Sequence, residues 1–122
     1  MSMKAWVCGL AVMTTTVVGA NERLTMQVFP AMSFAPANLV IRTRLEPDVN
    51  NRVMEVIAES DEFYRSSAIQ LEGDRAPRAA TFEFRSLPPG EYAVMAVVIG
   101  ADGQRRAVAR SSVHIMEGGA SR

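Results

Sequence analysis

Apolar and polar residues alternate with a period of two along most of the chain after residue 20, which constrains the fold more than any other feature. In one such run, Phe82 and Phe84 flank Glu83. This period is typical of strands with one buried face, whereas a helix would repeat every 3.6 residues, and β-branched and aromatic residues are enriched in the same runs. The predicted strands cover residues 23–29, 38–45, 52–59, 63–71, 79–86, 91–100 and 104–116.

Turn-forming residues separate these runs. Pro30 and Pro36 interrupt the first section, and the prolines at 88 and 89 prevent a strand from continuing because proline cannot donate to a ladder. Asp102 and Gly103 favour a hairpin between the last two strands. Seven short strands predict an all-β fold, a seven-stranded antiparallel β-sandwich, with a small closed barrel as the alternative.

The first twenty residues have the three parts of a secretory signal peptide. Lys4 supplies the positive start, residues 5–18 are uncharged and mainly apolar, and small residues precede Asn21. A periplasmic or secreted protein is therefore expected, with a retained anchor as the alternative. No stable membrane insertion is expected after cleavage, because a spanning helix needs about 20 apolar residues. The predicted organisation is a signal peptide over 1–20, a β-sandwich domain over 21–117 and a disordered tail over 118–122.

Composition excludes several classes of site and partner. The 122 residues contain one Cys and one His, which rules out a zinc finger, a cysteine-ligated iron–sulfur cluster and an internal disulfide. Thirteen basic residues balance thirteen acidic ones, so no nucleic-acid partner is expected. The alternation places the strand arginines, Arg106 among them, at outward positions where they solubilise the sheet and pair across strands.

The residues from 87 to 94 read Leu-Pro-Pro-Gly-Glu-Tyr-Ala-Val. This run resembles the corner before the penultimate strand in fibronectin type III domains and, more closely, in carboxypeptidase regulatory-like modules. The resemblance implies an immunoglobulin-like or fibronectin-like sandwich whose fold corner is formed by Leu87, Gly90 and Tyr92. Fibronectin-like modules usually carry a buried tryptophan on an early strand, and the chain after residue 20 has none.

One pair of residues is a candidate metal site. His114 and Met116 are two positions apart on a predicted strand, so they share a face, and thioether sulfur favours Cu(I). A His-x-Met pair resembles that of periplasmic copper carriers. The simpler interpretation is a solvated histidine and a methionine that fills the core, so no cofactor is expected. No catalytic set of residues is recognisable, because Ser111 and Ser112 lie on the same strand as the single histidine.

The strand over residues 91–100 is apolar on both faces, which indicates either a shielded central strand or a contact surface. We expect a protein partner or self-association on the outer face.

The function predicted from the sequence is an exported, non-catalytic interaction module, and not an enzyme. It would act by sheet-face or edge-strand contact. The alternative is a small periplasmic copper or ligand carrier that uses His114 and Met116. The residues expected to form the contact face are Met95, Val97, Ile99 and Val108.

Overall fold

The structure is a computed structural model that describes residues 23–118. The expected signal peptide over 1–20 lies outside the described residues, as do residues 119–122 of the expected tail. Within the described range, no helix is long and apolar enough to cross a membrane.

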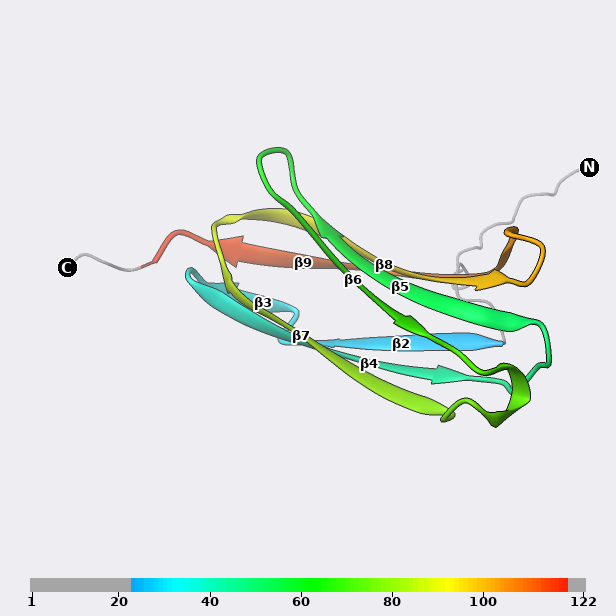
Figure 1. The fold of residues 1–122 in the computed structure, drawn as a ribbon. Coiled ribbons are helices and arrows are strands. Elements are labelled where there is room, and N and C mark those ends of the chain that lie inside the picture. The colour runs from blue at the N-terminus through cyan, green and yellow to red at the C-terminus, as the bar shows by residue number, and fades with distance from the viewer. Residues whose placement is uncertain (1–22, 119–122) are drawn as a thin grey trace, which may run out of the picture.

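Two β-sheets pack face to face (Figure 1). The smaller sheet has the order β2-β4-β7, with strands β2 (Leu24–Phe29), β4 (Ala37–Leu45) and β7 (Ala79–Leu87). The larger sheet has the order β3-β9-β8-β5-β6. Its strands are β3 (Met32–Phe34), β5 (Asn51–Glu59), β6 (Tyr64–Gln70), β8 (Gly90–Gly100) and β9 (Arg105–Met116). A short 3₁₀ helix, η2 (Gly73–Arg75), lies between β6 and β7.

The all-β, two-sheet prediction is confirmed, but the expected seven antiparallel strands are corrected in two respects. Each of the seven predicted runs contains a strand, and an eighth strand, β3, is present in residues 23–118. This strand pairs in parallel with β9 after the chain crosses from the smaller sheet to the larger one. Because β3 has only three residues and lies between Pro30 and Pro36, its alternation is too short to recognise in the sequence.

The core lies between the two sheets and is built from the alternating apolar positions of both. Successive side chains on a strand point to opposite faces, so every second residue reaches the interior. In β4 this places Leu39 and Ile41 inside and leaves Asn38 and Arg42 exposed. The largest fully buried side chains include Tyr92, Leu24, Leu39, Ile41, Met54, Leu87 and Ile115.

A buried tyrosine anchors one end of the sandwich, where β7 turns into β8. The side chain of Tyr92 is 1% exposed, and its hydroxyl donates a hydrogen bond to the carbonyl oxygen of Pro88 at 2.8 Å. Gly90 has a φ of 156°, and a Cβ atom there would lie 3.1 Å from Cβ of Ser60. Leu87 is fully buried beside this corner. At this corner the Tyr92 hydroxyl is therefore hydrogen-bonded within the chain, and the Leu87 side chain is buried.

A β-bulge interrupts the pairing of β8 with β9 at the opposite end. Val98 pairs with Ala107, whereas the next residue of β8, Ile99, pairs with Arg105. One residue of β9, Arg106, is therefore left without a partner opposite it. An inserted residue of this kind bends the strand and redirects its side chain, and bulges are frequent next to active sites.

A second irregularity lies on β5, on the other side of β8. Asn51 pairs with Gly100, and Val53 pairs with Ile99, so Arg52 is the residue that the ladder passes over. The two strands that flank β8 are therefore both irregular at the same end of the molecule. In the rest of these two ladders the pairing runs without a shift.

Candidate functional site

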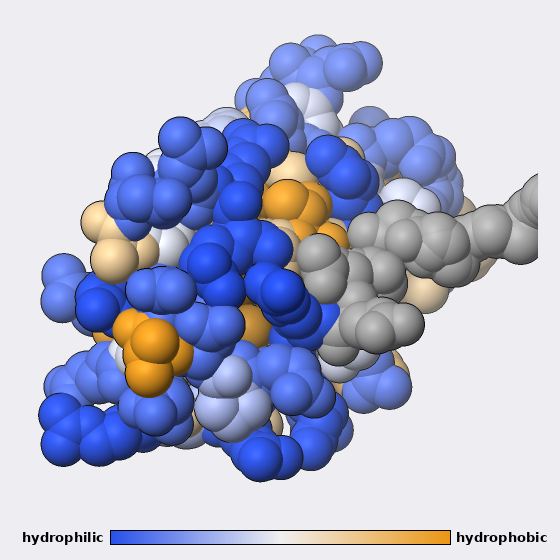
Figure 2. Space-filling view, turned by 90° about the vertical axis from the view of Figure 1, so that its right-hand side faces the viewer, coloured by the Kyte–Doolittle hydropathy of each residue, from blue (hydrophilic) through white to orange (hydrophobic). Residues whose placement is uncertain are grey.

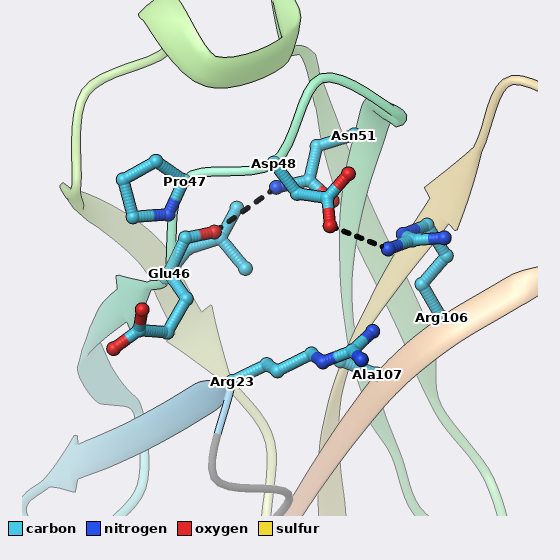
Figure 3. Close-up of a pocket in the computed structure, with 8 residues that line it drawn as sticks. Arg23, Glu46, Pro47, Asp48, Asn51, Arg106 and Ala107 are labelled. Carbon is cyan, nitrogen blue, oxygen red and sulfur yellow. Dashed lines mark hydrogen bonds and ion pairs between the residues drawn. The ribbon is translucent and has the colours of Figure 1, made fainter.

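A pocket of about 400 Å³ opens at the bulged end of the sandwich. Figure 2 views this end and shows a mainly hydrophilic face interrupted by small hydrophobic areas. The pocket combines two guanidinium groups, two carboxylates, an amide and apolar side chains (Figure 3). Its lining residues are Arg23, Leu45, Glu46, Pro47, Asp48, Asn51, Arg106 and Ala107.

An ion pair between Arg106 and Asp48 forms one side of the pocket. Nη2 of Arg106 donates to Oδ2 of Asp48 at 2.7 Å, and the two side chains are 22% and 32% exposed. The second carboxylate oxygen of Asp48 accepts a hydrogen bond from the backbone N–H of Asn50 at 2.8 Å. The carboxylate is thus held from two sides and fixes one edge of the guanidinium.

A second nitrogen of the same guanidinium has no hydrogen bond within the described part of the chain. Nε of Arg106 is buried and has no hydrogen-bond partner among residues 23–118. Most buried donors in folded proteins are paired, and an unpaired one costs about 1–3 kcal/mol. An acceptor that entered the pocket and reached this nitrogen would remove that cost.

Gly100 gives Arg106 the room to adopt this position. A Cβ atom at position 100 would lie 2.6 Å from Cδ and 3.1 Å from Cγ of Arg106. The aliphatic part of the arginine therefore lies directly against the backbone at the end of β8. A residue with a side chain at this position would push the guanidinium away from Asp48.

Arg23 brings a second positive charge to the pocket. Figure 3 shows its side chain extending along the pocket toward Arg106 and Ala107, with the Asp48 carboxylate above it. The pKa of Asp48 is lowered, first by the hydrogen bond from the Asn50 backbone and then by the charges of Arg106 and Arg23, although partial burial acts in the opposite direction. Asp48 is therefore ionised at neutral pH.

The remaining lining groups give the pocket its shape. Asn51 is 3% exposed, and its Nδ2 donates to the backbone carbonyl of Glu46 at 3.2 Å, which ties the β4–β5 loop to the sheet. The Glu46 carboxylate points away from the ion pair in Figure 3. Leu45, Pro47 and Ala107 add apolar surface. The charged groups that lie close together in the pocket are therefore the guanidinium groups of Arg23 and Arg106 and the carboxylate of Asp48.

His114 and Met116 lie at the other end of β9, away from this pocket. Both are half-buried, and they occupy alternate positions of the strand, next to Met32 and Phe34 of β3. Nδ1 of His114 contacts a carboxylate oxygen of Glu91. Among residues 23–118, no three or more His, Cys, Asp or Glu side chains gather in a way that could hold a metal ion.

The four residues expected to form a contact face lie on the outer face of the larger sheet. Val97 pairs with Val108, and Met95 and Ile99 occupy the same face of β8. Val97 is 2% exposed although it lies outside the core cluster, and the other three residues are half-buried. Much of this apolar surface is thus already covered within the chain, and its use as a contact face stays a prediction.

Sequence reasoning did not identify Arg106 as part of a site. Alternation placed it outward with the other strand arginines, whereas the structure half-buries it and pairs it with Asp48. The sequence does show two adjacent arginines shortly after the Asp102–Gly103 turn, and a glycine at position 100 before that turn. A bulge leaves little other trace in a sequence.

Comparison with known proteins gives a fold but no family. No protein-family model matches this sequence, and a search of curated proteins found no similar sequence.

Similarity to solved structures extends over about three quarters of the chain. The superoxide reductase (neelaredoxin) from Ignicoccus hospitalis has a TM-score of 0.60 and 14% identity, over 75% of this chain and 79% of that one. A family 76 glycoside hydrolase from a bovine Bacteroides thetaiotaomicron strain has a TM-score of 0.54 and 16% identity, over 76% of this chain and 20% of that one. Fibronectin(III)-like modules of Clostridium thermocellum CbhA have a TM-score of 0.48 and 10% identity, over 78% of this chain and 98% of that one.

These likenesses show the fold alone, but they correct the functional expectation from the sequence. The superoxide reductase is an enzyme whose fold this chain shares at a TM-score of 0.60. The prediction of a non-catalytic interaction module is therefore wrong, as is the prediction that the chain is not an enzyme. The alternative of a copper or ligand carrier is set aside with it. The physical reason is that one β-sandwich fold can support different functions. The chemistry depends on individual side chains, and these need not form a recognisable sequence motif.

Proposed function

We propose that this chain binds a small anion in the pocket at the bulged end of the sandwich. The single observation that carries the proposal is the guanidinium of Arg106, whose Nη2 is paired with Asp48 while its Nε is buried and has no partner among residues 23–118. Hydrogen bonds between guanidinium and an anion are among the stronger ones in proteins, because both partners are charged.

Three further features support the proposal. The bulge at Arg106 and the bare backbone of Gly100 orient the arginine before any ligand arrives, so binding requires little ordering of this side chain. Arg23 adds a second positive charge on the same side of the pocket. The volume of about 400 Å³ falls in the range of small-molecule sites.

The experiment is isothermal titration calorimetry with acetate, benzoate and sulfate as probe anions. The wild-type chain is expected to bind at least one of them saturably at one site. Arg106→Gln should weaken that binding about tenfold or more, because a charge-assisted hydrogen bond is lost. The matched control is Arg85→Gln, since Arg85 lies in an ion pair with Glu83 that is 74% exposed on the arginine side.

Two results would contradict the proposal. One is the absence of saturable binding of all three anions to the wild-type chain. The other is an equal loss of affinity in Arg106→Gln and Arg85→Gln, which would mean that only the overall charge of the protein matters. Superoxide reduction is not carried over from the structural neighbours, because 14% identity supports a common fold and not a common activity.

The fold family and the compartment are proposals as well. The strand orders β2-β4-β7 and β3-β9-β8-β5-β6, with the Tyr92 corner between β7 and β8, support an immunoglobulin-like or fibronectin-like topology. The composition of residues 1–20 supports export to the periplasm or beyond. A mass that begins at Asn21, measured on protein recovered from the periplasm of a bacterial host, is the expected result. An uncleaved chain would contradict export by this route.

A further inference from the structure

A second surface, the outer face of the larger sheet, carries an inference that does not depend on the pocket at the bulged end. We infer that two copies of this chain pack these outer faces together, around a two-fold axis that runs parallel to β8. The contact is formed by the outward side chains of β5, β8 and β9. The inference concerns how the chain assembles, and the lining of the anion pocket takes no part in it.

The centre of this outer face is an apolar stripe along β8. Its outward side chains there are Met95, Val97 and Ile99. In the register of the sheet, Ile57 of β5 lies beside Met95, and Val108 of β9 lies beside Val97. Val97 is 2% exposed and the other four are half-buried. The solvated face of an antiparallel sheet is usually polar, whereas an apolar stripe is what packing against a second sheet requires.

Opposite charges flank the stripe on its two sides. Glu55 and Glu59 occupy outward positions of β5, and Arg110 occupies an outward position of β9. Arg110 is in register with Met95 and Ile57, so it lies midway, along the strands, between the two glutamates. The two charged flanks are two strand spacings apart, about 10 Å, because β8 lies between them. None of the three charged residues forms an ion pair with another residue in 23–118.

This arrangement of charges selects a second copy of the chain as the partner. A two-fold axis parallel to β8 exchanges the two sides of the stripe, so it places β9 of one copy over β5 of the other. Positions along the strands are unchanged by such an axis. Arg110 of each copy therefore faces Glu55 and Glu59 of the other, and the contact occurs twice. The face is complementary to itself both in charge and in its apolar centre.

The shape of the face also suits a second sheet. A hollow of about 280 Å³ is lined by residues of all three strands, including Ala93 and Met95 on β8 and the charged residues Glu59 and Arg110 on either side. Side chains of packed sheets interdigitate, and a flexible methionine of the second copy can fill such a hollow. Tyr64 of β6 is in register with Glu59 and 55% exposed, so it extends the apolar surface toward that edge of the sheet.

The experiment is sedimentation velocity of the chain over a range of about 1–200 µM, which covers micromolar dissociation constants. The wild type is expected to show a reversible equilibrium between monomer and dimer. Arg110→Glu should raise the dissociation constant about tenfold or more, because like charges then face each other at two places in each dimer. Glu59→Arg should also raise it, for the same reason. The double variant restores opposite charges between these two positions, so it should dimerise more tightly than either single variant.

The matched control is Arg44→Glu, which makes the same charge reversal at an exposed position of β4 in the smaller sheet. Its dissociation constant should equal that of the wild type. Arg110 and Glu59 are exposed as well, so all of these variants are expected to fold. Circular dichroism and thermal melting of each variant establish that it does.

Four results would overturn the inference. The first is a wild-type chain that stays monomeric over the whole range, and the second is an assembly larger than a dimer. The third is a dimer that Arg110→Glu weakens no more than Arg44→Glu does, which would place the contact on another surface. The fourth is a double variant that dimerises no more tightly than the single variants. None of these results bears on the proposed function, which is tested by anion binding.

Discussion

The two ends of this sandwich treat their polar groups differently. At the corner end, Tyr92 is buried and its hydroxyl is paired with the Pro88 carbonyl at 2.8 Å. At the bulged end, Arg106 is half-buried, one edge of its guanidinium is paired with Asp48, and Nε has no partner among residues 23–118. The tyrosine hydroxyl at the corner is paired within the chain, whereas the bulged end contains a buried donor with no partner among residues 23–118.

Under the proposed function, this difference separates the residues that stabilise the fold from those that bind a ligand. At the corner, the Tyr92 hydroxyl is hydrogen-bonded to a backbone carbonyl of the same turn, so substitutions there should change the free energy of unfolding. The bulged end holds an arginine beside a glycine and an aspartate, so changes there should act mainly on binding. The predictions that follow can each break or sharpen this separation.

The largest expected effect is on stability, at the corner. Tyr92→Ala removes a fully buried ring and should lower the free energy of unfolding by about 3–5 kcal/mol, as for other aromatic residues in cores. Tyr92→Phe keeps the ring and loses one hydrogen bond, so about 1 kcal/mol is expected. Denaturant unfolding measures both. Near-equal losses would mean that ring packing is not what anchors this end.

The next effect is on binding, at position 100. Gly100→Ala places a Cβ atom where the stem of Arg106 lies, so the guanidinium must move away from Asp48. Benzoate affinity should fall about tenfold, as expected for loss of one charge-assisted hydrogen bond, while the chain stays folded. Calorimetry and circular dichroism check the two parts. Wild-type affinity in this variant would show that the position of Arg106 does not depend on the glycine.

A smaller effect concerns pH. The folded pKa of Asp48 lies below its usual value, so the folded chain binds fewer protons at this group than the unfolded chain does. Its contribution is therefore complete above the unfolded pKa, near 3.8, and disappears as the pH falls through the lower folded pKa. The wild type should be more stable than Asp48→Asn at pH 7, and the difference should become smaller as the pH falls below the unfolded pKa of 3.8. Urea unfolding over a series of pH values tests this, and a difference that grows in acid would contradict it.

The smallest effect is expected at the exposed ion pair of Arg85 and Glu83. Arg85→Gln should change the free energy of unfolding by less than about 0.5 kcal/mol, because solvent screens exposed pairs and they contribute little. Thermal or denaturant unfolding measures it. A loss of several kcal/mol would mean that charge is structurally important over the whole molecule, and the contrast between the two ends would no longer hold.

The fold was largely predictable because alternation is a direct consequence of the sheet's two faces. Runs such as the one around Phe82 and Phe84 identified all seven longer strands. The three-residue strand β3 could not be found in this way, since alternation needs more residues to be recognised. Its parallel pairing with β9 is a long-range contact, and local pattern carries no information about it.

The candidate site was much less predictable, for a physical reason. A bulge adds one residue to one strand, and only the register with the neighbouring strand reveals it. Alternation therefore groups Arg106 with the solvent-exposed arginines, and it assigns no role to Asp48, which lies outside the predicted strands. Their proximity joins positions 58 residues apart. The lack of a catalytic motif was similarly weak evidence, because an enzyme shares this fold without a recognisable sequence relationship.

The most direct test of the account is NMR observation of the arginine Nε–H groups during a benzoate titration. The Arg106 signal is assigned by its absence from the spectrum of Arg106→Gln, and the Arg85 signal is assigned in the same way. The account predicts a saturable shift of the Arg106 Nε–H resonance, with the Arg85 resonance unchanged. An Arg106 signal that does not move, or that moves only together with Arg85, would contradict the claim that the bulged end is a binding site.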